Sequence, residues 1–395
     1  MIKSLKYFDV KNRKVLIRVD FNVPMADEKV VDDFRLRAAL PTIKDCLRQG
    51  AAVVIASHLG RPKGKPDKKF SLIPVGETLA DLLELPIKFS DDCISQDARD
   101  VSLGLKPGEV HLLENLRFHS GEEENDSDFS ALLARHAQIY INDAFGTAHR
   151  AHASNVGVAK LTPQKGIGHL MEKELHFLKG ITAKPARPFT MVLGGAKLKT
   201  KVELIKRFLS EADTLLVGGG MAFTFFKAQG KEIGKSLIDD RMIPVAKEII
   251  GLAHRREATL ILPSDIVCAS SLKKGAKSSV HSSRELPKTK MGLDIGPETA
   301  ERFTNEILKS KTVVWNGPMG VFEESGFEKG TLAVANAMAD ASEAGAVTVV
   351  GGGDSASAIN DFGMHHKMSH VSTGGGASLQ LLSGNPLPAL EVLEV

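Results

Sequence analysis

The chain of 395 residues has little of what several classes of protein depend on. Only 5% of its residues are aromatic and one is Trp, so we do not expect the base-stacking platforms of single-strand nucleic-acid binders. The formal net charge is +3, and basic and acidic residues are nearly balanced in both halves of the chain. That balance argues against a polycationic surface, and we predict no nucleic-acid partner.

Cysteines and long apolar runs are also scarce. Cys46, Cys93 and Cys268 are far apart and odd in number, so they predict neither a zinc motif nor a disulfide framework. A reducing cytoplasm is the simplest setting for them. The N-terminal segment lacks the apolar core of a signal peptide, and no uncharged apolar run reaches about 18 residues. We therefore expect a cytoplasmic protein that does not interact with membranes.

The most informative stretch is Val347-Thr-Val-Val-Gly351-Gly-Gly-Asp354-Ser355. Such a run predicts a buried parallel strand that ends where backbone N–H groups approach an anion at the start of a helix. Asp354 then stands where a phosphate-bound metal ion needs an oxygen ligand. A tight turn without a ligand is the alternative. Further glycine turns at residues 194–195, 218–220 and 374–376 favour the ligand.

In the first half, each predicted strand ends in polar residues. The strands are residues 15–19, 51–56, 109–113 and 138–141, and the polar groups that follow or accompany them are Asp20, Asn22, Arg35, His58, Arg61, Arg117 and Arg150. The four arginines among them are expected to meet at one sheet edge, and so many cations there predict a site for a compact, multiply anionic molecule. Arg35 in the first turn of a helix is electrostatically unfavourable, which favours a ligand role over a solvated one.

Two further features of this half, one arginine and one pair of histidines, also need an interpretation. Arg18, inside a strand, is expected to pair with a structural carboxylate rather than with substrate. The spacing His149-x-x-His152 could suggest a metal pair, but it lacks a third ligand at helical spacing.

The second half repeats the strand–helix alternation with different chemistry. Strands predicted at residues 189–193, 214–217, 258–262 and 312–315 lead to glycine turns and to Lys197, Lys201 and Glu323. The lysines either cover transferring phosphate oxygens or are solvated. We predict an α/β chain of two doubly wound, Rossmann-like parallel sheets, joined by a hinge with a cleft between them. Lys184-Pro-Ala-Arg-Pro188 is the best candidate boundary.

Two other nucleotide-binding classes fit less well. Gly351-x-Gly353-x-x-Ala356 fits the dinucleotide fingerprint, but no acidic residue ends the next predicted strand at residues 370–373, so an NAD-dependent dehydrogenase is a weak alternative. The nearest approach to a Walker A motif, Gly230-x-x-x-Gly234-Lys235-Ser236, is one residue short.

Eight segments, in order along the whole chain, resemble phosphoglycerate kinase. Those on the substrate side are Arg18-Val-Asp-Phe-Asn-Val-Pro24, Ser57-His-Leu-Gly-Arg-Pro62, Glu114-Asn-Leu-Arg-Phe118 and Ala148-His-Arg-Ala-His152. Those on the nucleotide side are Gly194-Gly-Ala-Lys197, Trp315-Asn-Gly-Pro-Met-Gly320, Gly351-Gly-Gly-Asp-Ser355 and Ser372-Thr-Gly-Gly-Gly-Ala-Ser378. The resemblance implies a glycolytic kinase that reversibly moves the acyl phosphate of 1,3-bisphosphoglycerate to ADP, giving 3-phosphoglycerate and ATP. A non-catalytic nucleotide-binding protein on the same fold is the alternative.

The resemblance also implies roles for individual residues. Substrate would contact Asp20, Asn22, Arg35, His58, Leu59, Gly60, Arg61, Arg117 and Arg150. The nucleotide would contact Gly194, Lys197, Lys201, Gly219, Gly292, Asn316, Glu323, Gly352, Gly353, Asp354 and Ser355. The catalytic set would be Arg35, Lys197, Lys201, Gly353 and Gly376, and Asp354 would bind Mg²⁺. An extra lysine, Lys199, departs from the family's usual pattern.

The domain organisation implied by the resemblance has three parts. Residues 1–172 form the substrate domain, residues 173–188 a hinge helix and linker, and residues 189–379 the nucleotide domain. The tail, residues 380–395, returns to the first domain, although Gln380 and Ser383 stand where the family commonly has acidic residues. The family likeness further suggests a monomer that acts only on small molecules.

Overall fold

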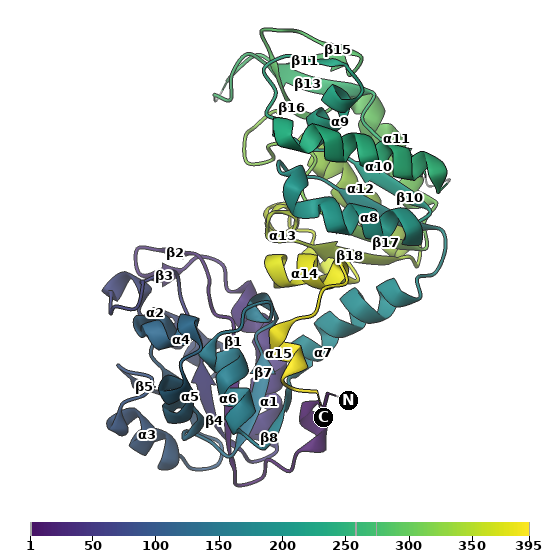
Figure 1. Cartoon of the computed structure of the whole chain (residues 1–395). Helices are drawn as coiled ribbons and strands as arrows, with labels where there is room; N and C mark the ends of the chain where they lie inside the picture. Colours follow the sequence, from purple (N-terminus) through teal and green to yellow (C-terminus); the bar gives the residue numbers. More distant parts are fainter. Residues whose placement is uncertain (1, 257–258, 274, 395) are drawn as a thin grey trace. The chain divides into compact units, whose positions relative to one another are not determined.

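The structure, a computed structural model, describes residues 2–256, 259–273 and 275–394 (Figure 1). Ala258, at the start of a predicted strand, and residues 1 and 395, at the ends of the predicted domains, lie outside this range. The chain forms two compact units. Unit 1 contains the residues up to His176 and those from Pro386 onward, and unit 2 is Phe177–Asn385.

The units divide the chain a few residues away from the predicted positions. Helix α7 (His169–Leu175) continues as the π-helical segment η6 (His176–Ile181), and the division falls between His176 and Phe177 rather than at residue 172. The tail of unit 1 begins at Pro386 rather than at residue 380, because helix α14 (Gly375–Leu382) packs within unit 2. There Arg207 Nη1 donates a hydrogen bond of 2.8 Å to the Leu382 carbonyl.

Unit 1 is built on a six-stranded parallel sheet. The strand order is β5-β6-β4-β1-β7-β8, with bounds β1 Lys14–Val19, β4 Ala52–Ala56, β5 Ile87–Ser90, β6 Val110–Leu113, β7 Ile139–Asp143 and β8 Gln164–Ile167. A short hairpin, β2 (Met25–Ala26) with β3 (Lys29–Val30), follows β1. The two edge strands, β5 and β8, were not predicted from the sequence.

Helices cover both faces of this sheet. They are α1 Phe34–Arg48, α2 Ile73–Leu83, α3 Gln96–Leu103, α4 Ser120–Glu124, α5 Ser127–Ala134, α6 Val158–Leu161, α7 and, in the tail, α15 Pro388–Glu391. Helix α1 contacts α2 and α7, whereas α5 contacts α4 and α6. The tail is joined to this unit by Ala389 N–H, which donates 3.2 Å to the Ala148 carbonyl.

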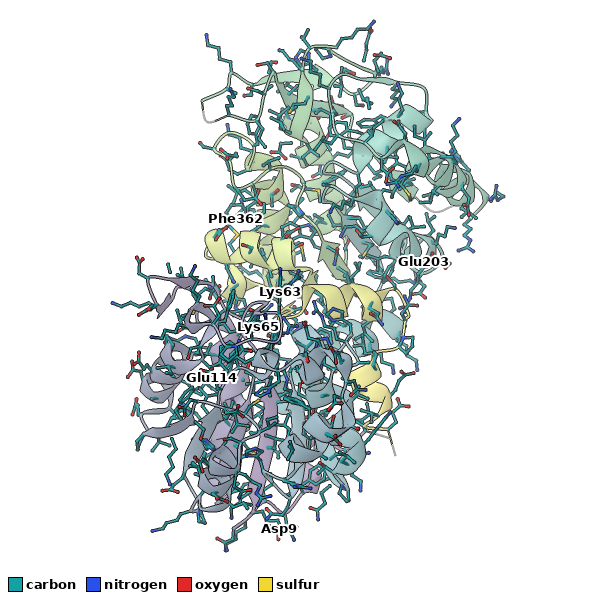
Figure 2. The ribbon with its side chains drawn as sticks, turned by 60° about the vertical axis from the view of Figure 1, so that its left-hand side comes forward. Asp9, Lys63, Lys65, Glu114, Glu203 and Phe362 are labelled. Atoms are coloured by element: carbon teal, nitrogen blue, oxygen red, sulfur yellow. The ribbon has the colours of Figure 1, made fainter. Side chains whose placement is uncertain are left out.

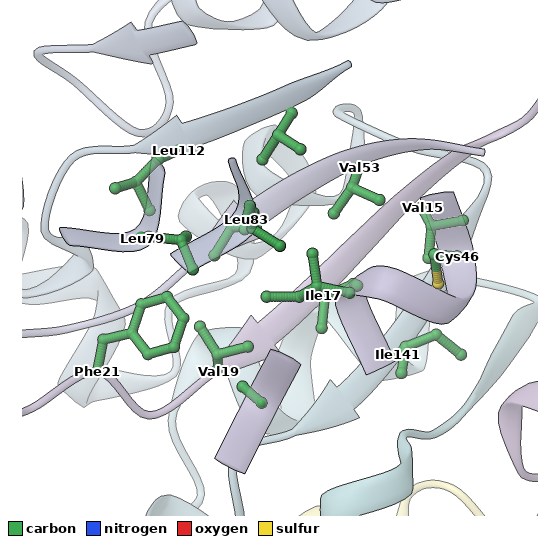
Figure 3. Packing of buried hydrophobic residues seen from close by; sticks show 14 of the residues in the cluster. Val15, Ile17, Val19, Phe21, Cys46, Val53, Leu79, Leu83, Leu112 and Ile141 are labelled. Atoms are coloured by element: carbon green, nitrogen blue, oxygen red, sulfur yellow. The ribbon is translucent and has the colours of Figure 1, made fainter. Parts of the chain in front are cut away.

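The main core of unit 1 follows from the two-residue alternation of β1. Val15, Ile17 and Val19 point to one face, where they pack with side chains of neighbouring strands and helices such as Val53 and Leu79 (Figure 3). Arg18 points to the opposite face. It is 1% exposed and its Nη2 lies 3.9 Å from Oε1 of the buried Glu122, which confirms the predicted pairing with a structural carboxylate.

Unit 2 is built on a second six-stranded parallel sheet. Its order is β12-β10-β9-β17-β18-β19, with bounds β9 Phe189–Leu193, β10 Thr214–Val217, β12 Thr259–Ile261, β17 Thr312–Asn316, β18 Val347–Gly351 and β19 His370–Val371. Numbered along the chain, this is the 3-2-1-4-5-6 order of Rossmann folds, and the order reverses between β9 and β17. Ligands bind at such a reversal, beyond the carboxyl ends of the strands.

The helices of unit 2 form two groups. Their bounds are α8 Val202–Glu211, α9 Ala222–Ala228, α10 Ile243–Arg255, α11 Pro297–Leu308, α12 Lys329–Glu343, α13 Gly353–Asp361 and α14. Helix α10 contacts α8 and α9, while α11 contacts α12. The prediction of two doubly wound α/β domains is confirmed for the fold, and the hinge and cleft remain predictions.

Unit 2 also carries two small sheets that were not predicted. One is antiparallel, β14-β13-β16, with bounds β13 Asp265–Ala269, β14 Ser279–Ser282 and β16 Met291–Ile295. The other pairs β11 (Glu232–Ile233) with β15 (Glu285–Leu286). No helix in the described part of the chain has the length and apolar character that a bilayer span requires.

Candidate active site

The polar residues that follow β1 are joined to the first turn of α1. Arg35 Nη1 donates to Asp20 Oδ2 and to the Asn22 carbonyl, both at 3.0 Å. The unfavourable place of Arg35 in its helix is therefore offset by a carboxylate, and its side chain remains 29% exposed. Asn22 Oδ1 in turn accepts from Gly60 N–H at 2.8 Å, which connects this loop to the loop after β4.

The loop after β4 is held by the residues that follow β6. The Leu59 carbonyl accepts from Asn115 Nδ2 at 2.7 Å, and the Gly60 carbonyl accepts from Arg117 Nη1 at 2.8 Å. Arg61 is exposed. The loop continues through Lys63 and Lys65, whose exposed side chains are labelled in Figure 2.

Four arginines surround the buried His58. Burial and the nearby charges of Arg18, Arg117, Arg35 and Arg150 hold the pKa of His58 well below its usual value, so its ring is neutral. His58 Nδ1 lies 3.3 Å from Arg18 Nη2 and 3.7 Å from Asp20 Oδ1. So many guanidinium groups near one partly enclosed point make a strongly positive site for a small anion.

The predicted substrate residues are thus brought together within unit 1. Asp20, Asn22, Arg35, His58, Leu59, Gly60, Arg117 and Arg150 are connected by the hydrogen bonds and electrostatic contacts above. Sequence reasoning missed Glu122, which is fully buried and accepts from Ser154 Oγ at 2.6 Å beside Arg18. Its position in an acidic run, Glu122 to Glu124, gave no signal that one of the three is buried.

In unit 2, two loops meet backbone to backbone at the strand-order reversal. Gly195 N–H donates to the Pro318 carbonyl at 2.8 Å. A Cβ on Gly194 would lie 2.2 Å from the Pro318 carbonyl oxygen and 2.5 Å from that of Gly317. The glycine is therefore required by this close approach, and the two loops form a floor made of backbone.

Lys201 is the one of the three nearby lysines that points into this region. It is 8% exposed, and its Nζ contacts Asn316 Oδ1 and lies 3.3 Å from the Asn316 carbonyl. Burial lowers the pKa of Lys201 to about 8, while the charge of Asp354 acts to raise it. Lys197 and Lys199 are exposed. The pKa of Asp239 is lowered mainly by its hydrogen bond with Arg241, and the charge of Lys199 adds to this shift. The predicted pair Lys197 and Lys201 thus differ in environment.

The turn from β18 to α13 has the predicted strand-to-helix form. Gly352 adopts φ +101°, a conformation that L side chains rarely adopt, and donates to Ser378 Oγ at 3.2 Å. Ser355 is buried and its Oγ accepts from Gly317 N–H at 2.6 Å. Gly353 and Asp354 are exposed in the first turn of α13, and Gly376 is exposed in the first turn of α14. These N-terminal turns present unpaired N–H groups to an anion.

A cavity of about 290 Å³ lies beside these loops. Its lining includes the predicted residues Gly219, Gly292, Glu323 and Asp354, together with apolar side chains. A Cβ on Gly292 would lie 2.2 Å from the ring of Phe223, so the glycine allows this ring to pack directly against the backbone of β16. An apolar slot with carboxylates at its edge suits a nucleoside whose sugar hydroxyls and phosphates face the polar groups.

Sequence reasoning missed most of the walls of this cavity. Phe223 and Leu293 line it without any motif that would mark them, whereas Met319 lies within the segment Trp315–Gly320 but was not among the predicted contacts. Asp294 also lines it, and burial raises its pKa to about 7, although Gly330 N–H donates to Oδ2 at 2.7 Å. A charged residue inside the apolar strand β16 was the available signal.

The donor set at Asp354 fits an ion that is shared with a nucleotide. Asp354 offers one exposed carboxylate, and it lies close enough to Lys201 to affect its pKa. Mg²⁺ is commonly held by one or two carboxylates and the phosphates of its substrate, rather than by a cage of protein ligands. The residues present therefore fit Mg²⁺ that arrives with a nucleotide.

Comparisons with known proteins cover the whole chain. A sequence model of the family "Phosphoglycerate kinase" matches residues 5–385. The chain is 49% identical over 391 residues to the phosphoglycerate kinase of Chloroherpeton thalassium, covering 99% of this chain and 98% of the relative. It is 47% identical over 396 residues to that of an Anaeromyxobacter species, covering 100% and 99%.

Solved structures give the same result. Phosphoglycerate kinase from Coxiella burnetii has a TM-score of 0.88 and 38% identity, covering 100% of this chain and 99% of that one. The enzyme from Pyrococcus horikoshii has a TM-score of 0.87 and 33% identity, covering 100% and 98%. The predicted kinase activity is confirmed at the level of the family, and the non-catalytic alternative is not supported. The chain belongs to the phosphoglycerate kinase family.

Proposed function

We propose that each unit of this glycolytic kinase binds one partner of the reversible reaction between 1,3-bisphosphoglycerate and ADP. The observation that carries the assignment of the nucleotide is the cavity of unit 2, with Lys201 and Asp354 close to each other beside its glycine loops. Phosphoryl transfer needs positioning and positive charge rather than a protein nucleophile. Lys201 and the N-terminal turns of α13 and α14 supply that charge and those N–H groups.

The substrate is assigned to unit 1. Arg35, Arg117 and Arg150 bind the carboxylate and phosphates of the glycerate, with Arg61 covering the exposed side. His58 takes part as a neutral hydrogen-bonding group because burial, together with the charges of the arginines, lowers its pKa. Asp20 and Asn22 orient the glycerate hydroxyl and hold Arg35 and Gly60 in place. Arg35 and Lys201 stabilise the transferred phosphoryl group, and Lys197 assists from its exposed position.

The nucleotide contacts follow the cavity. Gly219 and Gly292 flank the base, Glu323 accepts from the ribose, and Asn316 orients Lys201. Gly194, Gly352, Gly353, Ser355 and Gly376 position phosphate oxygens through backbone N–H groups or the hydroxyl. Asp354 would hold Mg²⁺, which when bound would reduce the negative charge of the phosphate groups.

We also propose a domain movement and an oligomeric state. Transfer requires both bound partners to meet, so we include the predicted hinge at residues 173–188 and closure when both are bound. We also propose a monomer in the cytoplasm. Three free, buried cysteines are compatible with a reducing compartment.

The activity is tested by coupling it to glyceraldehyde-3-phosphate dehydrogenase. ATP and 3-phosphoglycerate together should produce NADH consumption, and omission of either should abolish it. Absence of turnover with the purified, folded chain would contradict the proposal. Light scattering of the protein as it elutes from a size-exclusion column measures its molar mass and so tests whether it is a monomer.

The metal assignment has a test of its own. Asp354→Ala should weaken the binding of MgADP by about 10- to 100-fold and leave the affinity for metal-free ADP nearly unchanged, because the exposed carboxylate contacts the ion and not the base. Calorimetry of both forms measures this, and equal weakening of the two would remove Asp354 from the metal site.

A further inference from the structure

Three potential metal ligands meet in unit 1 outside the active site. Asp92, Cys93 and His119 each offer one ligand atom, and these atoms all lie within 4.8 Å of one another. Asp92 and Cys93 follow β5, and His119 lies between the 3-10 turn η3 (Leu116–Phe118) and α4. The group is assembled by tertiary structure, since the sequence separates His119 from the other two.

Each of the three residues is held by its surroundings. Asp92 Oδ1 accepts from Ile94 N–H at 2.7 Å and from Ser95 N–H at 2.9 Å, which leaves Oδ2 facing His119 Nε2 at 3.1 Å. The ring of His119 packs on Phe129, with centroids 5.6 Å apart. The Cys93 carbonyl accepts from His136 Nε2 at 3.1 Å, provided that this nitrogen carries the proton. Ligands that are already oriented lose little freedom on binding an ion.

The group has a solvent side and a buried side. The side chains of His119 and Asp92 are 31% and 38% exposed, whereas Cys93 is 1% exposed. An ion can therefore arrive through the carboxylate and imidazole and meet the sulfur on its inner side. The fourth position of a tetrahedral ion then faces outward, where water can occupy it.

The electrostatics favour a cation. Asp92 contributes a carboxylate whose Oδ2 lies 3.1 Å from His119 Nε2. Burial and the charges of Asp92, Glu122 and Glu114 raise the pKa of Cys93 well above its usual value. The same carboxylates that oppose a thiolate attract a divalent ion, and coordination supplies the positive charge that the thiolate lacks.

We propose that Asp92, Cys93 and His119 bind one zinc-class divalent ion, with water as the fourth ligand. Zinc accepts sulfur, nitrogen and oxygen donors together, whereas Mg²⁺ prefers oxygen alone. The ion takes the place of the hydrogen between His119 Nε2 and Asp92 Oδ2. That hydrogen moves to His119 Nδ1 by exchange with solvent, which gives Nε2 a lone pair for the ion, and the Cys93 thiol releases its proton to solvent. Tetrahedral bonds of about 2.0–2.3 Å place the ligand atoms about 3.3–3.8 Å apart. His119 Nε2 and Asp92 Oδ2, 3.1 Å apart, are already that close, so only Cys93 Sγ has to approach the other two, by at most about 1 Å. This inference is independent of the proposed function.

The test uses the full chain and Co²⁺ as a spectroscopic probe of the same site. Wild-type protein should bind one equivalent and show a thiolate-to-cobalt absorption band that Zn²⁺ removes by competition. Cys93→Ser should lose the band and bind Zn²⁺ about 100-fold or more weakly. Removing a residue that only hydrogen-bonds to a metal ligand lowers metal affinity by about 10–100-fold, and removing the ligand itself should cost at least as much. His119→Gln, a partly exposed position, should weaken Zn²⁺ similarly without endangering the fold.

Controls separate this site from other histidines and thiols. Cys268→Ser removes another buried thiol, one whose charged neighbour is Lys290, and should leave the band intact. Zn²⁺ should raise the unfolding temperature of wild type and of Cys268→Ser, but not that of Cys93→Ser. A band that survives in Cys93→Ser, equal Zn²⁺ affinity in His119→Gln, or no one-equivalent binding to wild type would each overturn the proposal.

Discussion

Lys201 shows how position changes the chemistry of a single residue. Three lysines, Lys197, Lys199 and Lys201, occur within one short glycine-led segment. Two are exposed, and the third is buried against Asn316 with its pKa lowered to about 8. A buried ammonium is poorly solvated by water, so it interacts strongly with a phosphate that arrives beside it.

The exposed and buried lysines give a matched pair of substitutions. Lys201→Met should reduce kcat by about 10²–10³, the usual cost of removing a charge that stabilises the transition state. Lys199→Met removes the same charge from an exposed position and should leave kcat within about twofold. The coupled assay measures both. A loss in Lys199→Met equal to that in Lys201→Met would reject the assignment of Lys201.

The lowered pKa of Lys201 predicts a pH dependence of nucleotide binding. Below about pH 8 the side chain is charged, so the affinity for metal-free ADP should fall, by roughly 10- to 100-fold, as the pH rises through that value. Calorimetry at pH values on both sides of it measures the change.

The control for this pH dependence is Lys201→Met, which should show no decline over that range. The free energy of unfolding should change in the opposite direction. Between about pH 8 and the ordinary pKa of 10.5, the unfolded chain binds more protons than the folded chain, so Lys201 destabilises the fold less as the pH rises. A wild-type affinity that stays constant across the range would contradict the prediction.

At the scale of elements, the contact between the loops after β9 and β17 depends on the absence of side chains. The Pro318 and Gly317 carbonyls occupy the space that a Cβ on Gly194 would need. Backbone cannot move aside as cheaply as the end of a flexible side chain. The loops therefore have to separate if Gly194 is replaced.

Gly194→Ala should destabilise unit 2 by about 1–3 kcal/mol and lower its affinity for ADP. Trp315 is the single Trp of the chain and is buried in β17, so its fluorescence in urea reports on this unit. Gly251→Ala, within α10, is the control: its nearest neighbour would be the flexible end of Arg255 at 3.4 Å. It should be neutral or more stable by about 0.5–1 kcal/mol. Equal stabilities for the two variants would contradict the close-approach argument.

At the scale of the whole molecule, the two kinds of chemistry belong to different compact units. The arginines gather in unit 1, and Lys201, Asp354 and the cavity are in unit 2. Neither unit alone contains all the groups that the proposed reaction needs. Because we propose that each ligand has most of its contacts in one unit, closure should need both ligands.

Small-angle scattering tests this closure. The radius of gyration should fall when 3-phosphoglycerate and a non-transferable MgATP analogue are both bound, and should change less with either alone. The free protein and the singly liganded forms are the controls. A radius that does not change in the ternary complex, in an active preparation, would reject the proposed closure.

The sequence by itself determined the central strands and the candidate active-site loops that follow them. Apolar runs such as those of β1, β4, β9 and β17 are buried on both faces, so their composition alone identifies them. The loops that follow carry polar residues or glycines whose chemistry does not depend on distant neighbours. Those local signals were enough to predict two parallel α/β domains, and the resemblance of eight segments predicted the phosphoglycerate kinase family.

Only the tertiary structure decided what depends on pairing across the chain. Edge strands β5 and β8 are partly exposed and lack a clear apolar pattern, so their pairing with β6 and β7 defines them. Burial separates Lys201 from Lys199, and Glu122 from Glu123, although their chemistry is the same. Cys93 and His119 meet because β5 and β6 are neighbouring parallel strands, and each residue lies in the segment that follows one of them. Such proximity is set by the fold, which no local pattern records.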